Sequence, residues 1–166
     1  ARSFNFTERF MSPTYKLAMT VALEHVTAIG SESTLSDNRL LDGAHPEMAR
    51  LWRWHAMEET EHKAVAFDVY REVAGNGFTA WLRRCFALLM VSFSMQLTIF
   101  ICLMRAALFR GLFFKPSSWG QLIKYLWFTP GAFRKEIPQY FTFFSPRFHP
   151  WHNNNYAHVK RLEKEY

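Results

Sequence analysis

The stretch from Trp54 to Tyr70, WHAMEETEHKAVAFDVY, places two histidines and three glutamates within eight residues and then turns apolar. At about 100° per residue, an α-helix would bring four of these groups into one arc roughly 100° wide. The four residues are His55, Glu58, Glu59 and His62. Glu61 and Lys63 point elsewhere on such a helix. The spacing therefore predicts a helix with its ionisable groups gathered on one side.

Apolar residues extend the same side of this helix in both directions. They are Met48, Leu51 and Trp52 before the cluster and Val65, Ala66 and Val69 after it. Ionisable groups on a core-facing stripe are costly to desolvate unless they are paired, hydrogen-bonded or bound to metal. We therefore expect the four groups to lie on a core face, and the alternative of a purely solvated charged face is the weaker interpretation.

Glu59-x-x-His62 is the part of the cluster with the spacing of a metal site. Residues three apart lie one above the other on a helix and can offer a carboxylate oxygen and an imidazole nitrogen to the same site. Such ligands suit iron, manganese or zinc. Because Glu-x-x-His is frequent in helices by chance, the motif alone is weak evidence.

A second helix shows a matching interruption, in LAMTVALEHVTAIG from Leu17 to Gly30. Ser12 as N-cap, Pro13 in the first turn and Gly30 as a stop predict a helix over residues 13–29. One stripe of it holds Leu17, Val21, Glu24 and Ala28, with His25 at its border. An acid again occupies an apolar position. Two helices with matching interruptions favour a shared metal site.

Composition predicts one helical domain over residues 1–166, because 166 residues that are 49% hydrophobic and 20% charged can bury one sizeable core. Cys85 and Cys102 lack metal-site spacing, so we expect reduced packing residues in a cytoplasmic protein. The chain opens at Ala1 without methionine and without a secretory signal. We therefore expect that upstream residues are missing.

The periodicity predicts an all-α fold with no competing strand pattern. Helices are expected near residues 13–29, 46–74, 78–110, 118–128 and 153–165. A polar loop over 31–45 joins the first two, Gly75–Gly77 ends the second, and Ser118 with Gln121 form a capping box for the fourth. We divide the chain into a metal-site helix pair (12–75), apolar helices with basic flanks (78–128) and a C-terminal irregular wrap and helix (129–166).

Charge is divided unevenly along the chain. Residues 1–80 hold eight Lys and Arg against eleven Asp and Glu, whereas residues 81–166 hold twelve against three. No acidic residue occurs between Glu72 and Glu136, and the twenty residues from Cys85 to Met104 carry no charge. Arginines flank this run on both sides, so its length and flanks meet the criterion for a membrane-spanning helix without fixing an orientation.

Two interpretations of the apolar run stay open. Its polar residues Ser92, Ser94, Gln96 and Thr98 suit a buried central helix, whereas basic residues interleaved with aromatic ones over 81–128 suit a membrane interface. The aromatic residues are Trp81, Phe109, Phe113, Phe114, Trp119, Tyr125 and Trp127. Nucleic acid is not expected as a partner, because no recognisable module or basic groove pattern is present.

The segments ALEHVTA, WRWHAMEETEHKAVAFDVY and FHPW, the last at Phe148–Trp151, resemble a bacterial family described as predicted metal-dependent hydrolases, a ferritin-like group. The resemblance is strongest over residues 20–70. It implies a ferritin-like helical bundle in which Glu24 is a lone carboxylate ligand and Glu59 with His62 form the paired motif. It also implies a divalent metal, with iron expected and manganese or zinc as alternatives, and a dinuclear centre when complete.

Only half of such a site is found in this sequence. Three explanations stay open: upstream residues are missing, a second chain completes the site, or a smaller site is built from His25, His55 and Glu58. We favour the first. In the complete site, His55 is expected to lie beside Glu24, Glu59 and His62 as a further metal ligand.

Three function classes follow from these ligands. In a metal-dependent hydrolase, the metal activates water and Glu58 or His55 moves the proton. In a di-iron oxidase or oxygenase, the apolar C-terminal half holds a small, lipid-like substrate. In a non-catalytic membrane-associated helical protein, the Glu/His cluster is structural. We favour the hydrolase.

Overall fold

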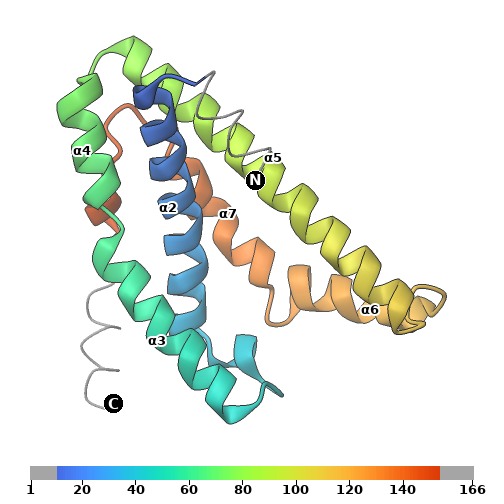
Figure 1. Cartoon of the computed structure of the whole chain (residues 1–166). Coiled ribbons are helices and arrows are strands. Elements are labelled where there is room, and N and C mark those ends of the chain that lie inside the picture. Colours follow the sequence, from blue (N-terminus) through green and yellow to red (C-terminus); the bar gives the residue numbers. More distant parts are fainter. Residues whose placement is uncertain (1–10, 154–166) are drawn as a thin grey trace.

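The computed structural model describes residues 11–153, which form helices and connecting turns with no strand in that range (Figure 1). The prediction of an all-α fold is therefore confirmed. The elements are α2 (Pro13–Ser36), η1 (Asn38–Leu41), α3 (Pro46–His62), α4 (Val65–Ala74), α5 (Phe78–Phe109), α6 (Pro116–Ile123), η2 (Lys124–Phe128), α7 (Ala132–Thr142) and η3 (Pro150–His152).

Helix α2 lies at the centre of the fold and packs against α3, α4, α5 and α7. Figure 1 shows it between the α3–α4 pair on one side and α5 on the other. Ala18 and Ala22 on α2 and Ala87 on α5 are completely buried. Small side chains at these positions let the helix backbones approach closely, so α2 can be covered on several sides at once.

The main core joins α2, α4, the first half of α5 and the segment after α7. Its buried members are Ala18, Val21, Ala22, Ala66, Phe67, Tyr70, Ala80, Ala87, Leu88, Val91, Phe143 and Phe148. The Tyr70 hydroxyl donates to the Ala80 carbonyl at 2.8 Å, and the Trp81 indole donates to the Phe144 carbonyl at 2.9 Å. These bonds tie α4 and the segment after α7 to the first turn of α5.

Helix α2 begins where the sequence predicts and ends later. The Ser12 hydroxyl accepts a hydrogen bond from the Tyr15 amide at 3.3 Å, as expected for an N-cap. The prediction that Gly30 stops the helix, with a loop from residue 31, is wrong because α2 runs on to Ser36. Leu35 in this extension packs in a small cluster with Ala56 and Met57 of α3. Tertiary packing therefore outweighs the low helix propensity of glycine.

The predicted helix over 46–74 is divided at Lys63 and Ala64 into α3 and α4. No proline or glycine marks this break in the sequence. Lys63 is 5% exposed, and its ammonium group donates to the Asn153 carbonyl and lies 4.5 Å from the centre of the Trp151 ring. The break thus coincides with a buried lysine directed at the C-terminal segment.

Predictions for the second half of the chain succeed in part. Helix α5 matches the expected 78–110 closely. The capping box at Ser118 is wrong, because α6 begins at Pro116 with Lys115 as N-cap, and residues 124–128 form a π-helical turn. The described part of the predicted C-terminal wrap, residues 129–153, is not entirely irregular, since it contains α7. The helix expected at 153–165 lies outside the described residues, apart from Asn153.

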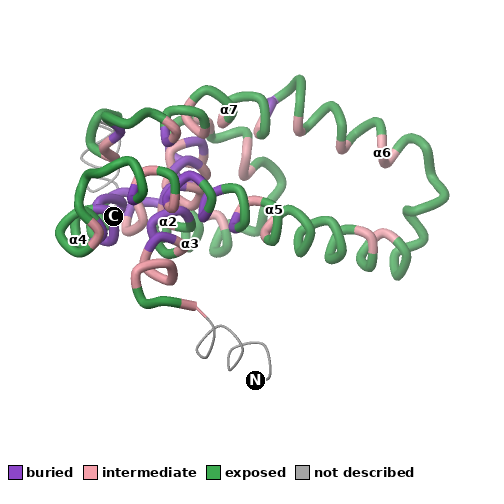
Figure 2. Tube along the Cα trace, turned by 90° about the horizontal axis from the view of Figure 1, so that it is seen from above, coloured by how far each residue is buried: buried purple, intermediate pink, exposed green. Residues whose placement is uncertain are grey.

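The two halves of α5 have different environments. Residues of α5 up to Val91 contribute to the core, whereas none from Ser92 to Phe109 is buried (Figure 2). Within the described part of the chain, α5 is the one helix long and apolar enough to cross a membrane, and only 17% of its most apolar window is buried. Within residues 11–153, the part of the run from Ser92 to Met104 is therefore not buried. Both cysteines are free; Cys85 is buried as expected, but Cys102 is exposed.

Candidate metal site

Thr27, on α2 and one turn after Glu24, connects α2 to the carboxylate of Glu59 on α3. The Thr27 hydroxyl lies 2.8 Å from Oε2 of Glu59 and 3.1 Å from the backbone carbonyl of Glu24. Oε2 of Glu24 accepts a hydrogen bond from the amide of Ala66 at 3.2 Å. Since Ala66 is in the first turn of α4, the Glu24 carboxylate also supplies an acceptor for one of the unpaired amides of that turn.

His55 and His62 lie beside this pair of carboxylates. Nε2 of His55 is 3.7 Å from Oε1 of Glu59. Burial is the main cause that raises the pKa of Glu24, with a smaller increase from the Glu59 carboxylate and an opposing decrease from His62. Of the residues that the sequence selects, the structure therefore places His55 beside Glu59, and Glu24 close enough to Glu59 and His62 for their charges to interact.

The expectation that the cluster lies on a core face is wrong for the described chain. Helix α3 buries a different face, made of Ala56, Met57 and Thr60. Apolar residues of the predicted stripe are about half exposed, with 50% for Leu51 and 52% for Trp52. His55 and His62 are exposed as well, whereas Glu59 turns toward α2. Ala66 is the one apolar member of the stripe that is buried, and the other apolar members are left exposed by residues 11–153.

The smaller metal site that was one alternative, built from His25, His55 and Glu58, does not form in the described chain. His25 is buried, with ring-centre distances of 4.7 Å to Phe143 and 5.1 Å to Phe148, and burial is the main cause that lowers its pKa to about 4. Glu58 is half-buried and makes no hydrogen bond or ion pair with other described residues. His25 is therefore a core residue in this structure.

The donor chemistry suits a metal, but the number of ligands is incomplete. Carboxylates and imidazoles are suitable ligands for iron, manganese or zinc. Nevertheless, no group of three or more His, Cys, Asp or Glu side chains in residues 11–153 is arranged to hold a metal ion. The described residues thus fit a part of a metal centre and do not form a whole one.

Sequence reasoning missed Thr27 and the roles of the FHPW segment. Thr27 is three residues after Glu24, so it shares a helix face with it, and this spacing was an available signal. In the FHPW segment, Phe148 is buried in the core and Nε2 of His149 lies 3.1 Å from Oδ1 of Asp68 on α4. The segment therefore fastens the C-terminal region to the α3–α4 pair.

The described chain is all-α and carries a cluster of Glu and His side chains on the neighbouring helices α2 and α3. The chain belongs to the family of predicted metal-dependent hydrolases, whose family model matches residues 1–154. The resemblance to this family found from the sequence motifs is therefore confirmed, whereas the ferritin-like arrangement that the resemblance implies stays a prediction. No curated protein matches the chain, and no solved structure matches it either.

Proposed function

We propose that the protein is a metal-dependent hydrolase in which Glu24, Glu59, His62 and His55 supply one part of the metal centre. The observation that supports this assignment is the proximity of two carboxylates. The Thr27 hydroxyl lies 2.8 Å from Oε2 of Glu59 and holds that carboxylate toward α2, and the pKa of Glu24 is raised by burial and, in addition, by the Glu59 carboxylate. Two carboxylates held close together repel each other, which a cation between them would relieve. This arrangement agrees with the family to which the chain belongs.

The remaining ligands, in this proposal, come from protein that packs on the exposed stripe. Its apolar members are Met48, Leu51, Trp52, Val65 and Val69, with exposed fractions from 47% to 58%. Covering the exposed half of each such side chain would contribute about 0.8–1.5 kcal/mol, half the value for full burial, so an uncovered stripe favours association. Either a further segment of the protein or a second copy would add ligands opposite Glu59 and His62.

A bound divalent metal would lower the pKa of its water and polarise the substrate oxygen. Glu58 is the candidate for moving the proton, and His55 is the alternative if it does not bind the metal. They lie on the same helix as Glu59, and His55 is exposed. Glu58 is half-buried and has no other described partner, which leaves its carboxylate available as a base.

Removal of metal is expected to abolish hydrolysis. The full natural chain is assayed on a panel of carboxylic and phosphoric esters, before and after treatment with a chelator, and then with iron, manganese or zinc restored. Loss of activity with the chelator and recovery with one metal supports the proposal. Hydrolysis that persists in metal-free protein contradicts it. An iron content with an oxygen-dependent optical change, and no hydrolysis, instead indicates the di-iron oxidase or oxygenase.

Membrane contact is a second functional candidate, carried by the exposed distal half of α5. Large apolar side chains there are widely exposed, including Phe93 at 67%, Phe100 at 56% and Phe109 at 85%. Figure 2 shows that this half and α6 form an exposed arm away from the buried part of the molecule. An apolar surface of this extent is typical of a protein or membrane interface. We propose that a lipid surface covers the arm. In this arrangement the Glu/His cluster lies on the cytoplasmic side of the membrane, and the substrate is a lipid-like molecule.

Cell fractionation is expected to place the full natural chain with the membranes. High salt should not release it, because the exposed arm offers phenylalanine, leucine and isoleucine side chains to lipid in addition to basic groups. A carbonate wash then separates embedded from peripheral protein. Phe93→Asp with Phe100→Asp should increase the released fraction. Recovery of the unmodified chain in soluble form without detergent, under every condition, contradicts membrane contact.

A further inference from the structure

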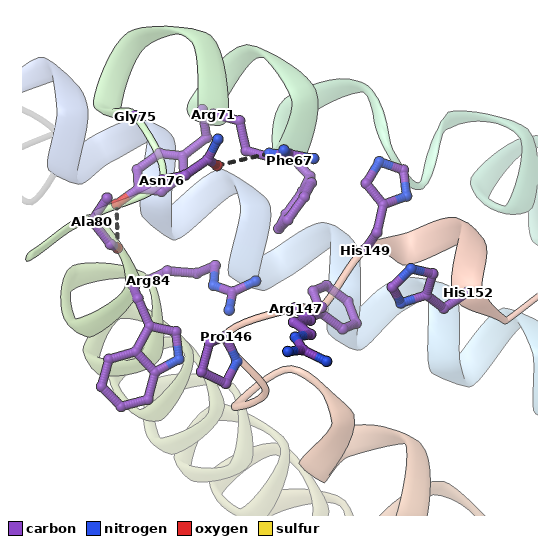
Figure 3. A pocket seen from close by; sticks show the side chains of 13 residues that line it. Phe67, Arg71, Gly75, Asn76, Ala80, Arg84, Pro146, Arg147, His149 and His152 are labelled. Atoms are coloured by element: carbon purple, nitrogen blue, oxygen red, sulfur yellow. Dashed lines mark hydrogen bonds between the residues drawn. The ribbon is translucent and has the colours of Figure 1, made fainter. Parts of the chain in front are cut away.

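A cavity lies apart from the candidate metal site, between α4, the first turns of α5 and the segment 146–152 (Figure 3). Its volume is about 400 Å³. Five basic side chains line it: Arg71, Arg84, Arg147, His149 and His152. No described lining residue carries a carboxylate. A cavity of this size with basic groups converging on it suits a small anionic group.

Arg84 is the buried cation of this pocket, with an exposed fraction of 4%. Its guanidinium donates to the Ser145 carbonyl at 2.9 Å and lies 4.7 Å from the centre of the Phe143 ring. No carboxylate in residues 11–153 pairs with it. Because a buried charge is stable only when it is paired or fully hydrogen-bonded, Arg84 retains capacity for an anion.

Two of the other basic groups, Arg71 and His149, are held by partners at the edge of the cavity. Nε of Arg71 donates to Oδ1 of Asn76 at 2.8 Å, which orients the guanidinium, while Nε2 of His149 lies 3.1 Å from Oδ1 of Asp68. Figure 3 shows Arg84, Arg147, His149 and His152 around one hollow.

The start of α5 contributes to the same cavity. Ala80 and Trp81, in the first turn of this 32-residue helix, also line it, and no side chain caps that end. The positive end of the helix dipole therefore reinforces the charge of the arginines.

We propose that this pocket binds a phosphoryl group, either of a small phosphate monoester or of a phospholipid headgroup. A phosphate dianion offers several acceptor oxygens and matches the planar fork of arginine, which binds it through paired hydrogen bonds. Three arginines suit a ligand with two negative charges better than they suit a carboxylate, which has one. The pocket shares no residue with the Glu/His cluster, so this inference does not depend on the proposed hydrolase activity.

The proposal is tested by titrating the full chain with inorganic phosphate. Calorimetry measures the binding, and the midpoint of thermal unfolding is measured at each phosphate concentration. Binding to the native state raises the thermal midpoint. Arg147→Gln should weaken phosphate binding about tenfold, because it removes a charge-assisted hydrogen bond from an exposed side chain without opening the core. Arg71→Gln should act in the same direction. Arg50→Gln is the matched control, since Arg50 is exposed and pairs with Glu47 at 3.1 Å on α3.

Arg84 is examined with two variants, because a buried residue can affect folding. Arg84→Lys keeps the charge but loses the paired hydrogen bonds, and Arg84→Met removes the charge. Circular dichroism confirms that each variant is folded before binding is measured. Weaker binding in the Arg147, Arg71 and folded Arg84 variants, with Arg50→Gln unchanged, supports the pocket. Absence of phosphate binding, or equal binding in all variants, overturns it.

Glycerol phosphate and a short-chain phosphatidic acid below its micelle concentration distinguish the two sources. Tight binding of both indicates a free phosphate monoester as the natural partner. A preference of about tenfold or more for the phosphatidic acid indicates the lipid headgroup, since the acyl chains then add apolar contact. Failure of both compounds, like failure of inorganic phosphate, overturns the assignment.

Discussion

Replacement of Phe143 by alanine is expected to lower the free energy of unfolding by about 3–5 kcal/mol. Phe143 is completely buried and lies with its ring centre 4.7 Å from that of His25 and 5.0 Å from that of Phe148. The Arg84 guanidinium lies over the same ring at 4.7 Å. The substitution therefore opens a cavity and removes an aromatic surface from a buried cation. Unfolding in denaturant, followed by circular dichroism, measures the loss.

Phe141→Ala is the matched control for this prediction. Phe141 is two residues before Phe143, at the end of α7, and is 62% exposed. A surface substitution of this kind usually changes the free energy of unfolding by about 0.5 kcal/mol or less. If both variants lose the same stability, Phe143 is not the centre of the core that joins α2, α5 and the C-terminal segment.

Local chain chemistry accounts for the elements that could be predicted. Ser12 with Pro13 mark the start of α2, and Gly75–Gly77 separate α4 from α5, because capping and glycine signals act within a few residues. The extension of α2 beyond Gly30 depends on contacts of Leu35 with Ala56 and Met57, which are distant in sequence. The low helix propensity of Gly30 is a local property, so it could not show that these contacts extend the helix.

The candidate site was predictable in composition but not in burial. Helical spacing places Glu59 and His62 on one side of α3, and the structure brings Glu24 to them. The same spacing cannot tell a stripe that packs within the chain from one that meets another protein surface, because both are apolar. Leu51 and Trp52 have the composition of a core and are about half exposed in the described chain, at 50% and 52%.

No local sequence signal predicts the division between α3 and α4. It coincides with the buried Lys63, which donates to the Asn153 carbonyl 90 residues later in the chain. This break frees the amide of Ala66 for the Glu24 carboxylate at 3.2 Å. A feature missed from the sequence thus helps to position a residue that the sequence identified.

Alanine at Glu59 or at His62 is expected to lower the metal bound to the full natural chain by more than about tenfold. Loss of a supporting residue outside the ligand set already costs about 10–100-fold in metal affinity, so loss of a ligand should cost at least as much. Glu59 is positioned for this role because Thr27 fixes one of its carboxylate oxygens and His55 lies 3.7 Å from the other. Elemental analysis of the purified variants, after growth with iron, manganese and zinc, measures the loss.

Glu61→Ala provides the control, since Glu61 has the same charge, lies between the two proposed ligands and is exposed. Its position on the helix is about 160° from that of Glu59, so it cannot reach the ion that Glu59 and His62 would bind. Equal metal loss in all three variants would show that net charge governs binding and not the helix face. Unchanged metal in all three would assign the Glu/His cluster a structural role, with Glu24 acting only as the acceptor for the first turn of α4.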